Sequence, residues 1–239
     1  MKKIIIPLSC LSAMSFLLVM CAEKASNQPP PVINTSLVNT AHLDYLYTPV
    51  TFSTGTKAAG VYIYAEAPDY HFVEAAGEGF SCVDDVARAA QVYLRSAAFA
   101  IDTAVQAKAF NLIRFILEMQ SDNGYFYNFL FTTGQINQFG STSINNANWW
   151  SWRALQTLSE AKPLIQNIDA QLYSDVDAAV NKLVAQIKID LVNLPQTTKV
   201  VSGITVPEWL PAGSGTDQAS LLILGLIPIA SADATIKDY

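Results

Sequence analysis

Hydrophobic residues recur at helical spacing in six separate segments of this chain, and this pattern limits the possible folds more than any other feature. The clearest segment places Val105, Ala109, Leu112 and Ile116 on one helical face. The segments comprise residues 34–49, 82–100, 103–119, 148–161, 169–194 and 216–229. Proline and glycine interrupt the chain between them. We therefore expect a mainly α protein with about six helices, arranged as an α/α-hairpin array or toroid.

Short β-prone runs lie between some of these helices. Residues 50–68 contain VTF and VYIY, and residues 125–139 contain YFYNFLF and GQINQF, so each stretch predicts a short β-hairpin. Residues 195–215 are rich in proline and glycine and predict a loop. The chain has 239 residues, 51% of them hydrophobic, which is enough for the core of one large domain or two small ones.

The first residues have the pattern of a targeting segment. Lys2 and Lys3 precede a mostly apolar run that ends at Met20, and Cys21 follows directly. This looks like a bacterial lipoprotein signal peptide over residues 1–20, with Cys21 lipidated and residues 21–33 forming a proline-rich tether. The alternatives are an ordinary signal peptide or an uncleaved anchor. We expect a lipid-anchored protein of the bacterial cell envelope.

The charge balance disfavours nucleic acid as a partner. The whole chain has a net charge of −6, and removing residues 1–20 takes away two lysines and no acid, which leaves −8. A surface of that sign repels phosphates, and no basic stripe offsets it. The only histidines are His42 and His71, so a His-centred triad or a multi-His metal site is disfavoured. We expect neither a metal nor a cofactor. Beyond residue 21, Cys82 is the only thiol.

The stretch GEGFSCVDDVARAA, residues 77–90, places two adjacent carboxylates at a predicted helix start. Asp84 fits a capping arrangement, with Ser81 as the N-cap and the acid opposing the helix dipole. Asp85 lies on a different line of the helix, bordered by small residues. Those small residues allow close packing or leave space for a ligand. We expect Asp85 to line a concave surface.

CVDDVARA, the DNGYFYNF segment and WWSWRALQTL resemble the inner-helix motifs of six-hairpin (α/α) toroids of the glycoside hydrolase-like superfamily. The resemblance covers roughly residues 40–230 and implies a carbohydrate-processing protein. A complete toroid of that type needs about twice as many helices as this chain supplies. The domain at residues 34–239 is therefore expected to be a truncated copy or an open arc.

Aromatic side chains crowd two segments and offer stacking surfaces for sugars, with amide, carboxylate and guanidinium groups nearby. The alternative for these aromatics is core packing, and SDNG, residues 121–124, is also an ordinary turn sequence. The residues expected to bind substrate are Asp84, Asp122, Asn123, Tyr125, Trp149, Trp150, Arg153 and Trp209.

Hydrolysis of a glycosidic bond usually needs two carboxyl groups. The candidates are Glu78, Asp85 and Glu208, which we expect to approach a groove lined by Trp149, Trp150 and Trp209. The sequence thus favours an exported glycoside hydrolase that acts on a poly- or oligosaccharide. A non-catalytic carbohydrate-binding or scaffold lipoprotein is the main alternative, and a polysaccharide lyase is a third.

Overall fold

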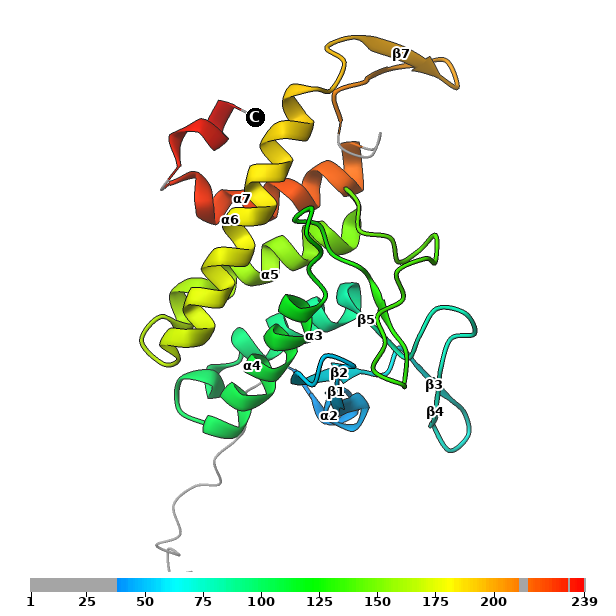
Figure 1. Cartoon of the computed structure of the whole chain (residues 1–239), viewed down its shortest axis with the longest axis vertical. Helices are drawn as coiled ribbons and strands as arrows, with labels where there is room; N and C mark the ends of the chain where they lie inside the picture. Colours follow the sequence, from blue (N-terminus) through cyan, green and yellow to red (C-terminus); the bar gives the residue numbers. More distant parts are fainter. Residues whose placement is uncertain (1–37, 211–214, 232, 239) are drawn as a thin grey trace, which may run out of the picture. The chain divides into compact units, whose positions relative to one another are not determined.

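Three helices run parallel and side by side through the structure: α3 (Val83–Leu94), α5 (Trp149–Ile165) and α7 (Ser220–Ala230). Figure 1 shows them as successive, roughly level helices, with α7 uppermost. The hydroxyl of Thr157 on α5 donates to the carbonyl oxygen of Ala87 on α3 at 3.1 Å. Gly225 lets α7 approach α5 closely, because a Cβ there would lie 2.7 Å from Cγ of Leu155.

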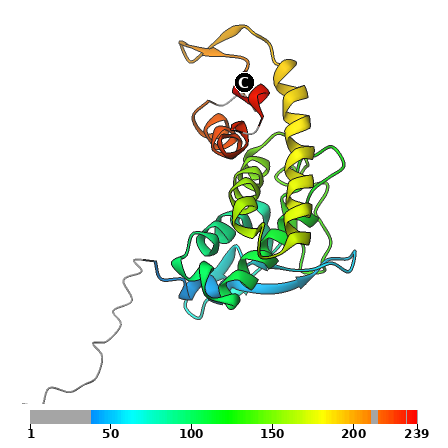
Figure 2. The same ribbon diagram turned by 90° about the vertical axis from the view of Figure 1, so that its left-hand side faces the viewer.

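Two further helices return beside this row, so that α3–α4 and α5–α6 are helical hairpins. They are α4 (Thr103–Glu118) and α6 (Ala170–Val192), which Figure 2 shows on one side of α5 and α7. Asp102 and Asp169 cap these helices, since their carboxylates accept from Ala104 N and Leu172 N. The prediction of a mainly α protein with short β-hairpins between helices is confirmed.

The computed structural model describes residues 38–210, 215–231 and 233–238. The predicted signal peptide, Cys21 and the tether lie outside these residues. Residues 40–239 form one compact unit. Among the helices within the described ranges, none is long and apolar enough to span a bilayer. The remaining helical elements are α2 (Ala41–Leu46), η1 (Ala97–Ala100), η3 (Gly215–Ala219) and η4 (Ala234–Asp238).

All described strands pair as short antiparallel ladders of two. The first and second pairs are β1 (Tyr47–Thr51) with β2 (Lys57–Val61), and β3 (Tyr64–Glu66) with β4 (His71–Val73). The third and fourth pairs are β5 (Ser81–Cys82) with β6 (Phe129–Leu130), and β7 (Thr198–Val201) with β8 (Ile204–Pro207).

The first predicted helix and the first predicted hairpin have different boundaries in the structure. Within the described part of residues 34–49, the helix is confined to Ala41–Leu46, and the chain then enters β1. Pro49 lies within β1 opposite Ala59. Because β1 pairs with β2 alone, its other edge makes no ladder hydrogen bonds, and a proline without an N–H is tolerated there. The second strand of the hairpin, β2, ends at Val61, and Tyr64–Glu66 belong to the separate pair β3–β4.

The second predicted hairpin, at residues 125–139, is confirmed only in its short central part. Backbone N–H groups of Phe131 and Asn137 donate to the carbonyl oxygens of Gln135 and Phe129, and an antiparallel bridge joins Leu130 to Ile136. The ladder of Phe129–Leu130, however, is with β5, just before α3. The pairing brings the loop after α4 against the segment that precedes α3. Two loops distant in sequence therefore meet near the start of α3.

Two other boundaries also differ from expectation. The predicted loop 195–215 contains the β7–β8 hairpin, whose turn residues Ser202 and Gly203 both have positive φ. Helix α5 continues past Pro163 to Ile165. Ala161 and Ile165 are fully buried, so core packing outweighs the hydrogen bond that proline cannot donate.

Candidate functional site

The start of α3 is built differently from the predicted capping box. Ser81 belongs to β5, and its hydroxyl oxygen accepts from the N–H of Val61 at 3.1 Å. Cys82 occupies the N-cap position and makes no side-chain capping bond to the helix backbone. The capping-box hypothesis for Ser81 and Asp84 is therefore wrong, and β5 pairing determines where the helix begins.

Asp84 joins α3 to α5 through ion pairs. Its carboxylate contacts the guanidinium of Arg88 at 2.9 Å and Nε of Arg153 on α5. Asn128 also holds the helix start, because its side-chain oxygen accepts from the N–H of Asp84 at 3.3 Å. Burial raises the pKa of Asp84, although the two arginines oppose that shift. The predicted substrate-binding residues Asp84 and Arg153 are thus brought together, but they bind each other.

Asp85 faces another direction and does line a concave surface. Its carboxylate contacts Arg88 and accepts from Sγ of Cys82 at 3.3 Å. The hollow has a volume of about 300 Å³, and most of its lining residues are aliphatic. None of the predicted tryptophans lines it. Burial and the neighbouring Asp85 carboxylate raise the pKa of the Cys82 thiol, which disfavours a nucleophilic thiolate there.

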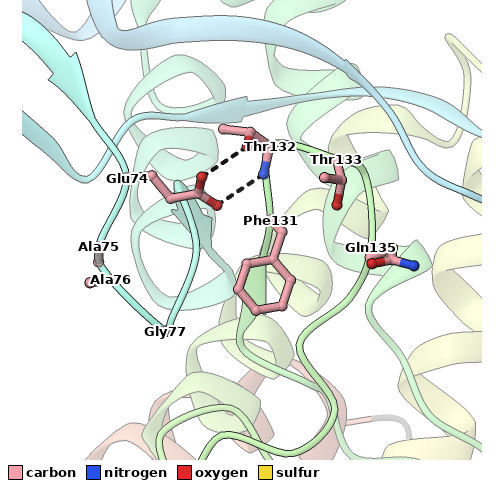
Figure 3. Close-up of a pocket in the computed structure, with 8 residues that line it drawn as sticks. All are labelled: Glu74, Ala75, Ala76, Gly77, Phe131, Thr132, Thr133 and Gln135. Atoms are coloured by element: carbon pink, nitrogen blue, oxygen red, sulfur yellow. Dashed lines mark hydrogen bonds between the residues drawn. The ribbon is translucent and has the colours of Figure 1, made fainter.

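A second hollow, of about 370 Å³, lies between the segment after β4 and the loop after β6. It is lined by Glu74, residues 75–77, Phe131, Thr132, Thr133 and Gln135. The carboxylate of Glu74 accepts from the backbone N–H of Thr132 at 3.0 Å and from its hydroxyl at 2.8 Å. Figure 3 shows the Phe131 ring below these two bonds, between Gly77 and Gln135 in that view. We call this hollow the Glu74 pocket.

Glu78 lies at the end of the wall of the Glu74 pocket. Asn137 holds this wall, since its amide donates to the carbonyl oxygens of Gly77 and Glu78 at 3.1 and 2.9 Å. The Glu78 carboxylate accepts from the hydroxyl of Thr142 at 2.6 Å. The predicted catalytic residue Glu78 therefore belongs to the same loop as Glu74, a carboxylate that the sequence analysis did not select.

The aromatic residues divide between core and surface. Trp150 is 1% exposed and its indole N–H donates to the carbonyl oxygen of Phe126 at 2.8 Å. Tyr125 is also buried, and its hydroxyl donates to the carboxylate of Asp190, so burial and that bond raise the pKa of the phenol. Trp149 is 45% exposed. Trp150 and Tyr125 therefore pack in the core, and of the two tryptophans at this helix start Trp149 is the one open to solvent.

Asp122 and Asn123 form the turn that their sequence also suggested. The Asn123 side chain accepts from the N–H of Tyr125 at 3.0 Å and donates to the carbonyl oxygen of Asn145 at 2.9 Å. The Asp122 side chain is fully exposed and lies 3.9 Å from the amine of Lys182. Neither residue lines one of the hollows described above.

Glu208 and Trp209 lie at the base of the β7–β8 hairpin. The Glu208 carboxylate accepts from the hydroxyl of Thr197 at 2.6 Å, which closes the hairpin base. Figures 1 and 2 show this hairpin at the opposite end of the unit from β1 and β2. The structure therefore does not gather Glu78, Asp85 and Glu208 into one groove, because each belongs to a different set of contacts.

The Glu74 pocket is the part of the site that the sequence did not predict. Phe131 was visible as part of an aromatic run, but Glu74 had no feature that linked it to that run. Within the described residues, no group of three or more His, Cys, Asp or Glu side chains is placed to hold a metal ion. No protein-family model matches this sequence, and the curated proteins contain no match to it.

Proposed function

We propose that this protein binds carbohydrate in the Glu74 pocket. The observation that carries the proposal is the pocket itself, which combines the Phe131 ring with a carboxylate, two threonine side chains and an amide. A sugar presents an apolar C–H face and several hydroxyl groups. An aromatic ring can stack on the first, and the polar groups can donate to or accept from the second.

The volume of about 370 Å³ suits a small part of an oligosaccharide. Glu74 is already oriented by its two bonds from Thr132, which leaves its remaining lone pairs as fixed acceptors. A fixed acceptor loses less side-chain entropy on binding than a mobile one. The parallel helices α3, α5 and α7, with α4 and α6 beside them, support an incomplete toroid of the glycoside hydrolase-like superfamily as the framework.

Replacing Phe131 with alanine should weaken oligosaccharide binding by about tenfold or more, because the variant loses the ring on which the sugar stacks. A tenfold loss of affinity corresponds to about 1.4 kcal/mol of binding free energy. The experiment is a screen of wild-type protein on a glycan array, followed by titration calorimetry with the best ligand. Phe139→Ala is the matched control, since Phe139 is 93% exposed and does not line the pocket. Equal affinities of the two variants would contradict the proposed site.

Hydrolysis is a second candidate activity, and it is favoured by a specific arrangement. Glu74 lines the pocket, and Glu78 directly follows the wall formed by residues 75–77, with its carboxylate accepting from the hydroxyl of Thr142. Glycoside hydrolases use two carboxyl groups, one as acid and one as base or nucleophile. Release of reducing ends from the ligands of the array would support hydrolysis if Glu78→Gln abolishes it and Asp85→Asn does not. Binding without release favours the non-catalytic function.

We also propose that the protein is exported and anchored by a lipid at Cys21. Changing Cys21→Ser should move the protein from the membrane fraction to the soluble fraction, because one thiol is the predicted lipid acceptor. Fractionation and metabolic labelling with a radioactive fatty acid measure this. A Cys21→Ser protein that stays in the membrane with its first residues retained would indicate an uncleaved anchor instead.

A further inference from the structure

The hollow beside Asp85 shares no lining residue with the Glu74 pocket and has a different chemical character. Its walls come from α2, β2 and the residues just after it, and α3. Leu43, Leu46, Val61, Ile63 and Val92 supply aliphatic surface, and Tyr62 supplies an aromatic wall. A hollow of about 300 Å³ with this lining lies at the lower end of the size range of small-molecule sites. We call it the Asp85 hollow.

The Asp85 hollow continues into a surface strip of aromatic rings. The Tyr62 ring stacks on Phe72 at a centroid separation of 4.2 Å, and Phe72 in turn lies 4.9 Å from the ring of Tyr45. Phe72 and Tyr45 are 39% and 48% exposed. Exposed apolar surface that continues from a concave hollow is a feature of ligand-binding grooves. An apolar body can therefore extend from the hollow over this strip.

The polar groups of the Asp85 hollow form an ion pair that can still make hydrogen bonds to a ligand. Arg88 contacts both Asp84 and Asp85 through the same nitrogen, Nη2. Within the described part of the chain, its Nε and Nη1 hydrogens have no protein partner, and the side chain is 48% exposed. Arg88 can therefore donate a hydrogen bond to a ligand oxygen, while the half-exposed carboxylate of Asp85 can accept one.

The charges around Arg88 select the kind of oxygen that fits. Two aspartates face one arginine at the hollow, and the second arginine, Arg153, is engaged with Asp84. A carboxylate or phosphate that binds Arg88 would be repelled by the carboxylates of Asp84 and Asp85. A neutral hydroxyl meets no such repulsion, and it can both accept from Arg88 and donate to Asp85.

We propose that the Asp85 hollow binds a neutral amphipathic molecule, an alkyl or aryl body that ends in a hydroxyl group. The body lies against Leu43, Leu46 and Tyr62, and the hydroxyl lies between Asp85 and Arg88. This site is independent of carbohydrate binding in the Glu74 pocket. Its occupant is recognised mainly by apolar contact, and the ion pair fixes its orientation.

The test uses 1-octanol as the probe, with sodium octanoate and octylammonium chloride as matched probes that differ in the charge of the head group. Each is titrated into the full chain while amide chemical shifts are followed by NMR. Octanol is expected to saturate below its solubility limit, with shifts confined to α2, β2 and the residues just after it, α3 and the strip of Tyr45 and Phe72. Octanoate is expected to bind about tenfold more weakly, a difference of about 1.4 kcal/mol, because the two aspartates repel its carboxylate. Octylammonium is expected to bind more weakly than octanol as well, because its head group cannot accept from Arg88 and has the same charge as Arg88.

Val92→Glu supplies the site variant, because Val92 lines the hollow and is 36% exposed, so a charged residue fits there without disturbing the core. Octanol binding should fall by about tenfold or more in this variant. Ile101→Glu is the control, since Ile101 is 87% exposed and lies outside the hollow. The proposal is overturned if octanol does not saturate, if a charged probe binds at least as tightly, or if the two variants bind octanol equally.

Discussion

Replacing Trp150 with alanine is expected to lower the free energy of unfolding by about 3–5 kcal/mol, the usual range for truncation of a fully buried tryptophan. Trp150 is 1% exposed, and its indole N–H donates to the carbonyl oxygen of Phe126 at 2.8 Å. The alanine variant leaves a cavity where the ring packed. It also leaves that carbonyl oxygen without its indole donor, which adds to the loss.

The neighbouring residue provides the matched control. Trp149 is 45% exposed and meets Trp150 edge to face, with ring centroids 5.9 Å apart. Trp149→Ala should therefore cost about 1 kcal/mol or less. Urea unfolding followed by far-ultraviolet circular dichroism measures both variants without depending on tryptophan fluorescence. Equal losses for the two substitutions would show that Trp150 is not the buried member of the pair.

The helices could be predicted from the sequence because their hydrophobic spacing is a local property. Residues 103–119 and 169–194 were assigned nearly to their observed ends, since capping aspartates and a following proline or turn mark them. The strand pairing could not be predicted in the same way. Phe129 and Leu130 pair with Ser81 and Cys82, a partner far along the chain that no local pattern specifies.

The site was harder to predict than the fold because adjacent residues on a helix face different directions. Trp149 and Trp150 differ by about 100° around α5, and which one is buried depends on where Phe126 lies. The role of Asp84 depends in the same way on Arg153, which lies on α5. Glu74 acquired a neighbour in Thr132 only through the packing of two loops.

Replacing Arg153 with methionine is expected to lower the free energy of unfolding by about 2–3 kcal/mol near neutral pH. The side chain of Asp84 is only 18% exposed, so losing Arg153 leaves a mostly buried carboxylate with one fewer cation. Methionine keeps most of the volume of the arginine stem, which limits the loss to the charge. Arg95→Met is the control, because the Arg95 side chain is 59% exposed and an exposed ion pair contributes about 0.2–1 kcal/mol.

The loss in Arg153→Met should shrink as the solution is acidified. Burial already raises the pKa of Asp84 above its ordinary value of 3.8, and Arg153 is one of the two arginines that oppose this shift. Without Arg153 the pKa rises further, so the folded variant takes up a proton at a higher pH than the unfolded chain does. A folded state that binds more protons gains stability as the pH falls through that raised pKa, and the gain is complete below 3.8.

Urea unfolding of wild type, Arg153→Met and Arg95→Met at about pH 7 and about pH 4 measures the difference. A loss in Arg153→Met that matches Arg95→Met, or that stays constant between the two pH values, would contradict a structural role for the Asp84–Arg153 pair.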